Sequence, residues 1–94
     1  MTTTYENIKP RTDLGVKKVD EDLLILDRQF DKIHQLNSTA HRIWCALSDG
    51  RSTEQIAKEI AAEFEVTPDE ASADVCRTIE QFIFLGLLTS KISD

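Results

Sequence analysis

The sequence predicts a small α+β domain of winged helix-turn-helix-like shape, in which a three-stranded antiparallel β-meander precedes three helices. Two observations lead to this fold. Short β-prone runs separated by turn-length spacers fill residues 16–36, as expected for consecutive hairpins. From residue 40 onward, apolar residues recur with the 3.6-residue period of helices. A chain of 94 residues buries one modest core and cannot enclose a large cavity.

The three expected strands lie at residues 16–19, 23–26 and 30–36. The middle run is apolar on both faces, as a central strand would be. The third run mixes polar and apolar residues, which is typical of an edge strand. Residues 1–13 have few apolar anchors, and we expect a flexible arm with order only toward its end. The domain itself is expected over residues 14–94.

The first two helices are predicted from their apolar faces and their ends. The face of the first helix is Ala40, Ile43, Trp44 and Leu47. Gly50 ends this helix, because glycine readily takes the left-handed conformation of a C-terminal cap. Ser52 and Gln55 form a capping box that opens the second helix. Its expected apolar face is Ile56, Ala57, Ile60, Ala61 and Phe64.

The third helix has the strongest start signal, with Thr67 as cap, Pro68 in the first position and Glu70 completing a capping box. It should run to about Leu85 and stop at Gly86, before a short strand or an extended tail. Its apolar arc spans about 180°, whereas a helix that covers one core needs only ~100° or somewhat more. The arc contains Ala71, Val75, Cys76, Ile79, Phe82, Ile83 and Leu85.

The excess flank of this arc, formed by Cys76, Ile79 and Ile83, either meets the sheet or lines a groove. Phe84 lies nearly opposite the arc and is expected to be an exposed anchor or to be covered by the tail. The third strand, as an edge, presents unpaired backbone groups. An extended peptide could therefore pair with that strand and place its side chains on the third helix. Ordinary protective edge polarity is the alternative explanation of Lys32 and His34.

The sequence shows no convergent polar chemistry of the kind that catalysis needs. His34, His41, Cys45 and Cys76 match no zinc or nucleophile signature. We expect both cysteines to be reduced and buried, with a disulfide between them as an open alternative. The glycines form no phosphate-binding loop. We therefore expect no catalytic residues, no metal site and no cofactor.

Charge argues against nucleic acid and membrane partners. The net charge is −6, and an acidic surface repels phosphates and anionic lipids. Arg77 is the single basic residue of the third helix, against Asp69, Glu70, Asp74 and Glu80. A winged-helix DNA-binding regulator is thus a disfavoured alternative. Without a signal peptide or a ~20-residue apolar run, we expect a cytoplasmic protein.

Several short segments, taken in order, resemble the PqqD family. The junction between the third strand and the first helix, Leu36-Asn37-Ser38-Thr39-Ala40, resembles the Leu-Asn-x-Thr-Ala signature of that family. The further matching segments are Ile43-Trp44, Asp49-Gly50, Thr53, Ile56, Asp74-Val75 and Gly86-Leu87-Leu88. Together they cover roughly residues 14–90.

The resemblance implies a non-catalytic, winged-helix-like domain that recognises precursors of ribosomally synthesised and post-translationally modified peptides (RiPPs). In the family, the leader of the precursor adds to the third strand and lies between it and the third helix. The domain presents the leader to a modifying enzyme, which is a radical SAM protein in pyrroloquinoline quinone (PQQ) biosynthesis. Lasso peptide and other RiPP pathways are the alternative, as is a regulatory adaptor that binds another protein.

Carried over to this chain, the resemblance implies a binding site with two walls. The strand wall is Lys32, Ile33, His34, Gln35 and Leu36. By helical spacing, the helix wall is Cys76, Ile79 and Ile83, with Val75 and Phe82 closer to the core. Asn37 is expected to cap the first helix. His34 stands where family members often carry an aromatic residue. The free edge can also pair with a second copy, so a monomer or weak homodimer is expected.

Overall fold

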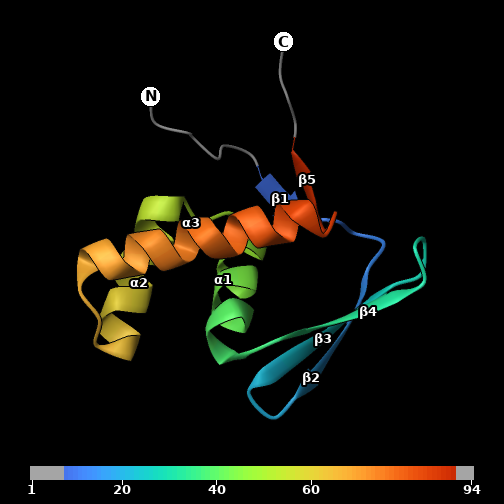
Figure 1. The fold of residues 1–94 in the computed structure, drawn as a ribbon, viewed down its shortest axis with the longest axis horizontal. Coiled ribbons are helices and arrows are strands. Elements are labelled where there is room, and N and C mark those ends of the chain that lie inside the picture. Colours follow the sequence, from blue (N-terminus) through green and yellow to red (C-terminus); the bar gives the residue numbers. More distant parts are fainter. Residues whose placement is uncertain (1–7, 91–94) are drawn as a thin grey trace.

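The computed structural model describes residues 8–90, and its strands and helices follow the predicted order (Figure 1). Three strands that follow one another in the sequence form an antiparallel meander, and three helices come after them. The predicted α+β fold is therefore confirmed, and it is compatible with a winged-helix-like shape. The elements are β1 (Ile8–Pro10), β2 (Gly15–Val19), β3 (Asp22–Asp27), β4 (Lys32–Leu36), α1 (Ser38–Ser48), α2 (Thr53–Phe64), α3 (Pro68–Phe84) and β5 (Leu88–Ser90).

Both hairpins of the meander contain an aspartate with positive φ. Asp20 (φ 56°) lies in the two-residue turn between β2 and β3, and Asp31 (φ 55°) ends the turn between β3 and β4. Aspartate tolerates this left-handed conformation better than most other residues with a side chain. The second turn also includes Phe30, so β4 begins at Lys32, two residues later than the sequence predicts.

Capping residues start all three helices where the sequence predicts them, although at α3 only the Thr67 half of the predicted capping box is formed. The side chains of Asn37, Ser52 and Thr67 each accept a hydrogen bond from the backbone N–H three residues on, and Ser52 belongs to a complete capping box. These bonds satisfy amides that have no partner within their own helix. Gly50 (φ 79°) and Gly86 (φ 74°) follow α1 and α3 in the left-handed conformation.

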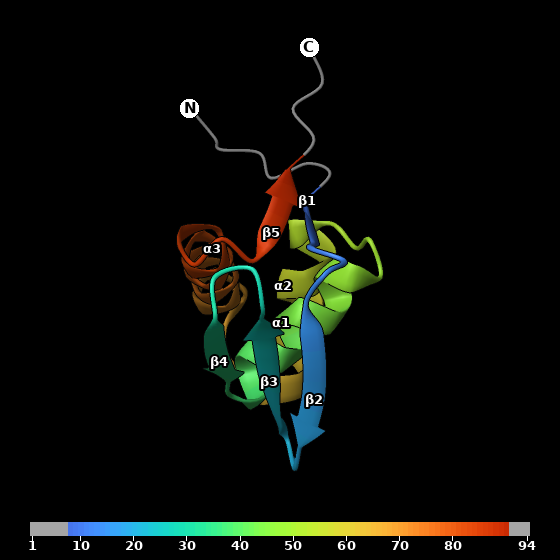
Figure 2. The ribbon, with the colours of Figure 1, turned by 90° about the vertical axis from the view of Figure 1, so that its right-hand side faces the viewer.

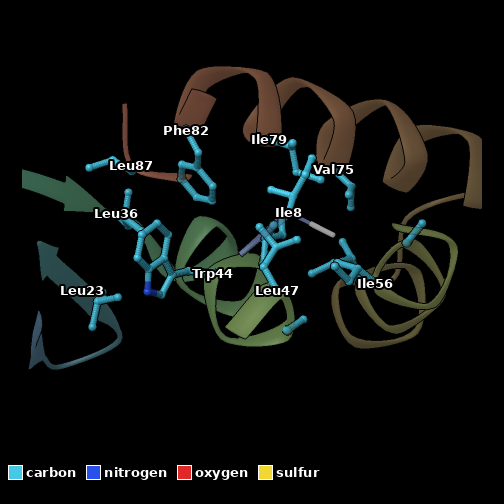
Figure 3. Close-up of a cluster of buried hydrophobic side chains, with 14 of the residues drawn as sticks. Ile8, Leu23, Leu36, Trp44, Leu47, Ile56, Val75, Ile79, Phe82 and Leu87 are labelled. Atoms are coloured by element: carbon cyan, nitrogen blue, oxygen red, sulfur yellow. The ribbon is translucent and has the colours of Figure 1, made fainter. Parts of the chain in front are cut away.

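The inner face of the sheet and the apolar faces of the helices meet in one core (Figure 3). Trp44 of α1 and Phe82 of α3 pack edge to face, with their ring centroids 5.3 Å apart and an interplanar angle of 85°, a geometry that aromatic pairs favour. Leu23, Ile25 and Leu36 enter this core from the sheet. The core thereby holds α1, α3 and the meander in fixed positions.

A second, two-stranded sheet lies outside the meander (Figure 1). β1 and β5 pair antiparallel, with Ile8 opposite Ser90, and the Ile8 side chain enters the core. The end of the expected arm is thus ordered over β1, whereas residues 1–7 lie outside the described residues. A three-residue strand has no detectable period, and its partner lies about 80 residues away. The sequence could not show this pairing, although a short strand was one expected form of the tail.

Arg11, just after β1, joins three parts of the chain through one guanidinium group. It donates two hydrogen bonds to the Asp27 carboxylate at the end of β3, at 2.9 and 3.2 Å. It donates another to the carbonyl oxygen of Gly86 after α3, at 3.0 Å. It also forms an ion pair with Asp13 at 2.6 Å, and it lies 5.7 Å from the ring centroid of Phe30. The arm, the turn before β4 and the exit of α3 are therefore tied together.

Asp27 is a buried carboxylate, only 2% exposed. Besides Arg11, it accepts hydrogen bonds from the backbone N–H groups of Gln29 and Phe30 in the turn. The hydrogen bonds from Arg11 lower the pKa of Asp27, and they outweigh desolvation, which acts in the opposite direction. Bonding to Asp13 and Asp27 raises the pKa of Arg11. Both partners of the buried pair therefore stay charged at neutral pH, as burial of a charge requires.

Replacement of Asp27 by asparagine should remove an acid-sensitive contribution to stability. In the unfolded chain the Asp27 carboxyl has the ordinary aspartate pKa of about 3.9. In the folded chain its pKa is lower. The contribution is therefore complete above the unfolded pKa and is lost as the pH falls through the folded pKa. In urea denaturation, Asp27→Asn should be less stable than the wild type at pH 7, and the difference should shrink at pH 3.

The matched control is Asp74→Asn, which breaks an exposed ion pair with Arg77 on α3. Exposed ion pairs contribute little to the free energy of unfolding. The free energy of unfolding of this variant should therefore match that of the wild type at both pH values. An Asp27→Asn difference that persists unchanged in acid would show that the charge of Asp27 does not stabilise the fold.

Candidate functional site

β4 is the edge strand of the meander, as the sequence predicts. It pairs with β3 on one side, and within residues 8–90 no strand pairs with its other side. Figure 2 shows β4 on the side of the sheet nearest α3. An edge strand presents a row of unpaired N–H and C=O groups. β4 can therefore accept one further strand.

The register indicates which backbone groups of β4 point to its open side. A two-residue turn joins β2 to β3, and the pair that closes such a turn is hydrogen-bonded. Bonding directions alternate along each strand of an antiparallel ladder, so His34 and Leu36 direct their N–H and C=O groups to β3. The corresponding groups of Ile33 and Gln35 therefore point away from the sheet and are available to an added strand.

A groove with a volume of about 420 Å³ runs beside this strand. It lies between β4 and the last turns of α3, and the start of α1 closes it on a third side. Figure 3 shows Leu36 of β4 close to Phe82 of α3. The residues that line the groove are Ile33, His34, Gln35, Leu36, Asn37, Ala40, Gln81, Phe82 and Leu85. An open strand edge and a groove thus lie side by side.

His34 contributes a buried polar atom to this region. Its side chain shares the inner face of β4 with the buried Leu36. The ring is half-buried, and its Nε2 atom is buried with no hydrogen-bond partner among the described residues. His34 is therefore not a fully exposed residue of the strand edge, because its face of β4 turns toward the core and α3. Most buried polar atoms in proteins have a partner.

No Lys, Arg, Asp or Glu is among the residues that line the groove, although the chain has a net charge of −6. Two charged residues of α3 pair with each other, with Arg77 donating to Asp74 at 3.1 Å. Nucleic acids need several cationic contacts to their phosphates. The groove therefore suits apolar and hydrogen-bonding side chains better than phosphates.

The predicted strand wall lies largely at the groove. Ile33, His34, Gln35 and Leu36 line it, whereas Lys32, at the start of β4, is exposed and does not. Ile33 is 68% exposed. The Gln35 amide donates a hydrogen bond to Asp22 of β3 at 2.9 Å. The side chain of Gln35 is thus held on the sheet while its backbone groups remain at the open edge.

The predicted helix wall differs from the geometry of the groove. Val75, Ile79 and Phe82 are at most 1% exposed and belong to the core, and of these only Phe82 also borders the groove. Cys76 and Ile83 are exposed but do not line it. The physical reason is that β4 approaches the opposite flank of α3, so that the flank bearing Cys76 and Ile83 faces away.

Gln81 and Leu85 form the helix side of the groove together with Phe82, and the sequence did not assign them to it. Gln81 is polar and falls outside the apolar arc, whereas Leu85 is indistinguishable from a core residue by its type. Their i, i+4 spacing places them on one face, which is the one signal that could have grouped them. Phe84 is 86% exposed, so it is not covered by β5.

The expectation that both cysteines are buried is wrong. Cys45 of α1 and Cys76 of α3 are free and exposed, because helical spacing turns each away from the core despite its apolar neighbours. His41 donates from Nδ1 to the carbonyl oxygen of Glu21 at 2.9 Å, away from the groove. Within residues 8–90, no three His, Cys, Asp or Glu side chains gather to bind a metal ion. No helix in the same range is long and apolar enough to span a membrane.

Residues 22–88 match the sequence model of a protein family, which is described as Coenzyme PQQ synthesis protein D (PqqD). The matched region begins at β3 and includes every residue that lines the groove. No curated protein matches the chain.

Two solved structures share the fold, each with a TM-score of 0.82. "Lasso peptide synthetase B1 complexed with the leader peptide" is 26% identical, and the match covers 88% of this chain and 98% of that one. "TbiB1 in Complex with the TbiA(beta) Leader Peptide" is 22% identical, with 90% and 99% covered. Likeness to the second structure supports the fold alone.

Two isoleucines one turn apart should separate the buried and exposed flanks of α3. Ile79→Ala should lower the free energy of unfolding by about 2–5 kcal/mol, because it opens a cavity in the core. Ile83→Ala should lower it by less than about 1 kcal/mol, since Ile83 is 47% exposed. Urea denaturation measures both values, and equal losses would contradict the orientation of α3 described above.

Proposed function

Because the chain belongs to the PqqD family, we propose that it is a non-catalytic peptide chaperone that binds the leader of a ribosomally synthesised precursor peptide. The leader adds to β4 as an extended strand and places side chains in the groove beside α3. The observation that carries this proposal is the outer edge of β4, which pairs with no other strand of residues 8–90 and lies next to that groove. Addition of a strand to a sheet edge is a recurrent mode of peptide recognition.

Backbone and side chains have separate roles in this mode of binding. The outward N–H and C=O groups of Ile33 and Gln35 pair with the leader, whatever its sequence. Alternate side chains of an extended strand point to the same face, so every second leader residue enters the groove. There, apolar leader residues meet Leu36, Phe82 and Leu85. The strand supplies affinity and the groove supplies specificity.

The bound leader is then presented to a modifying enzyme in the cytoplasm. The family description refers to PQQ synthesis, which favours a radical SAM enzyme as the partner. The structure 26% identical to this chain is a lasso peptide synthetase B1 with its leader peptide, which favours a lasso or other RiPP pathway. Synthetic leaders of a PQQ precursor and of a lasso precursor, titrated separately, discriminate between the two pathways.

The direct test is an NMR titration of the ¹⁵N-labelled chain with each of these two leaders. Binding should shift the amide signals of β4 and of the last turns of α3 in a saturable manner. The amides of α2 should remain in place, because α2 does not line the groove. If neither leader shifts any signal of a folded chain at high micromolar concentration, the proposal of leader binding fails.

Charge placed on the groove side of α3 should weaken leader binding more than charge on its other flank. Leu85→Glu introduces a carboxylate among apolar lining residues, where desolvation is costly, and should raise Kd at least about tenfold. Ile83→Glu, two residues away on the exposed flank, should leave Kd within about twofold. Isothermal titration calorimetry with the tighter of the two leaders measures both. Equal losses would place the leader elsewhere on α3.

Proline at position 35 should weaken binding through the backbone alone. Gln35→Pro removes an N–H that faces the open edge, where proline is tolerated, and one lost hydrogen bond corresponds to a rise in Kd of about 2- to 12-fold. Gln35→Ala is the matched control, because it removes the same side-chain bond to Asp22 but keeps the N–H. If the proline variant is folded and binds as tightly as the alanine variant, the leader does not pair at this amide.

A further inference from the structure

His34 has an unmet hydrogen-bonding capacity at the groove. It lines the groove from β4, and its Nε2 is buried with no partner among the described residues. Two other polar residues that line the groove are engaged, because the Gln35 amide donates to Asp22 and the side-chain oxygen of Asn37 accepts from the N–H of Ala40. A buried nitrogen without a partner is a cost to the free chain that a ligand can remove.

We propose that His34 selects leaders with an oxygen-bearing side chain, namely a hydroxyl, carboxamide or carboxylate, at the position that faces it. This inference rests on the proposed function and names the chemistry that the groove recognises. In the tautomer that carries hydrogen on Nε2, this N–H can donate a hydrogen bond to any of these oxygen atoms. In the other tautomer, Nε2 can accept a hydrogen bond from a hydroxyl group. An apolar residue at that position would leave Nε2 unpaired in the complex as well.

Strand geometry predicts the sequence pattern of a leader that bonds to His34. His34 and Leu36 lie on the same face of β4, two residues apart, and an added strand presents its side chains with the same period. One inward leader residue therefore faces Leu36 and Phe82 and is apolar. The next inward residue, two positions along the leader, faces His34 and carries the oxygen. The residue between them points outward, near Ile33 and Gln35, and is variable.

Access to Nε2 requires a small movement in the groove, because the atom is shielded in the free chain. Gln81 is exposed and unbranched, and it lines the groove on the opposite side. We expect its displacement to open a path to the imidazole, at little cost in packing. A bond between the Gln81 amide and Nε2 is the competing arrangement, so the test includes Gln81→Ala.

The probe is a phage-displayed library of random 12-residue peptides, selected on the full chain and in parallel on His34→Phe. Phenylalanine keeps a ring of similar size and removes both nitrogens. The wild type should enrich peptides with an apolar residue two positions from Ser, Thr, Asn, Gln, Asp or Glu. The His34→Phe variant should keep the apolar preference and lose the polar one. The identity of the enriched polar residues then distinguishes hydroxyl, carboxamide and carboxylate.

A double-mutant cycle with one selected peptide measures the contact itself. Alanine in place of its polar residue should raise Kd about 3- to 10-fold for the wild type and leave Kd for His34→Phe unchanged. His34→Gln, whose amide reaches about as far as Nε2, should restore part of the discrimination. The control is His41→Gln, which lies outside the groove and should retain the full effect of the peptide substitution. Gln81→Ala tests the competing contact: its own Kd can change because Gln81 lines the groove, but the peptide substitution should still raise that Kd by the same factor.

The outcomes separate this inference from the proposed function. The role of His34 is overturned if the wild type enriches peptides that show the apolar preference alone. It is also overturned if the peptide substitution changes Kd equally for the wild type and His34→Phe. In both cases the proposal of peptide binding still stands. If the peptide substitution no longer changes Kd for Gln81→Ala, the contact belongs to Gln81, and the role of His34 is equally overturned. Failure of the folded wild-type chain to enrich any peptide overturns both proposals.

Discussion

The contact between Arg11 and Asp27 sets the geometry on which the groove depends. Asp27 ends β3 just before the turn into β4, and Gly86 follows α3, so one guanidinium bonded to both fixes the strand and the helix relative to each other. Two bonds to one carboxylate make this contact directional as well as strong. Arg11 is in turn held by the pairing of β1 with β5. The small second sheet therefore shapes a groove to which it contributes no lining residue.

Local signals in the sequence predicted most of the fold. Asn37, Ser52 and Thr67 cap the helices they were expected to cap, because a cap is a relation between residues three positions apart. The meander was predictable for the same reason, since its turns are short. The pairing of β1 with β5 was not predictable, because it joins residues far apart and each strand is too short to show a period. The Arg11 contacts depend on that pairing, and no local pattern of charges indicates them.

The groove was predictable in position but not in its helix wall. The edge position of the third strand follows from the order of the elements, and its place beside the third helix is what the resemblance to the PqqD family implies. A helical wheel, however, gives the width of the apolar arc and not the flank that the sheet approaches. The core extends over Ile79, and the groove lies on the side of Gln81 and Leu85. The same limit explains the two cysteines, whose apolar neighbours suggested burial although helical geometry turns both outward.

The pairing of β1 with β5 also determines how this domain can be joined to other proteins. Ile8 and Ser90 are partners across that small sheet, so the chain enters and leaves the domain at neighbouring points. A domain with adjacent ends can be inserted into a longer polypeptide, or attached to one at either end, with little strain on either fold. Because neither strand lines the groove, such a connection leaves it unobstructed. The fold is therefore suited to fusion with, or insertion into, another protein, because the point of attachment is separate from the groove that we propose binds the leader.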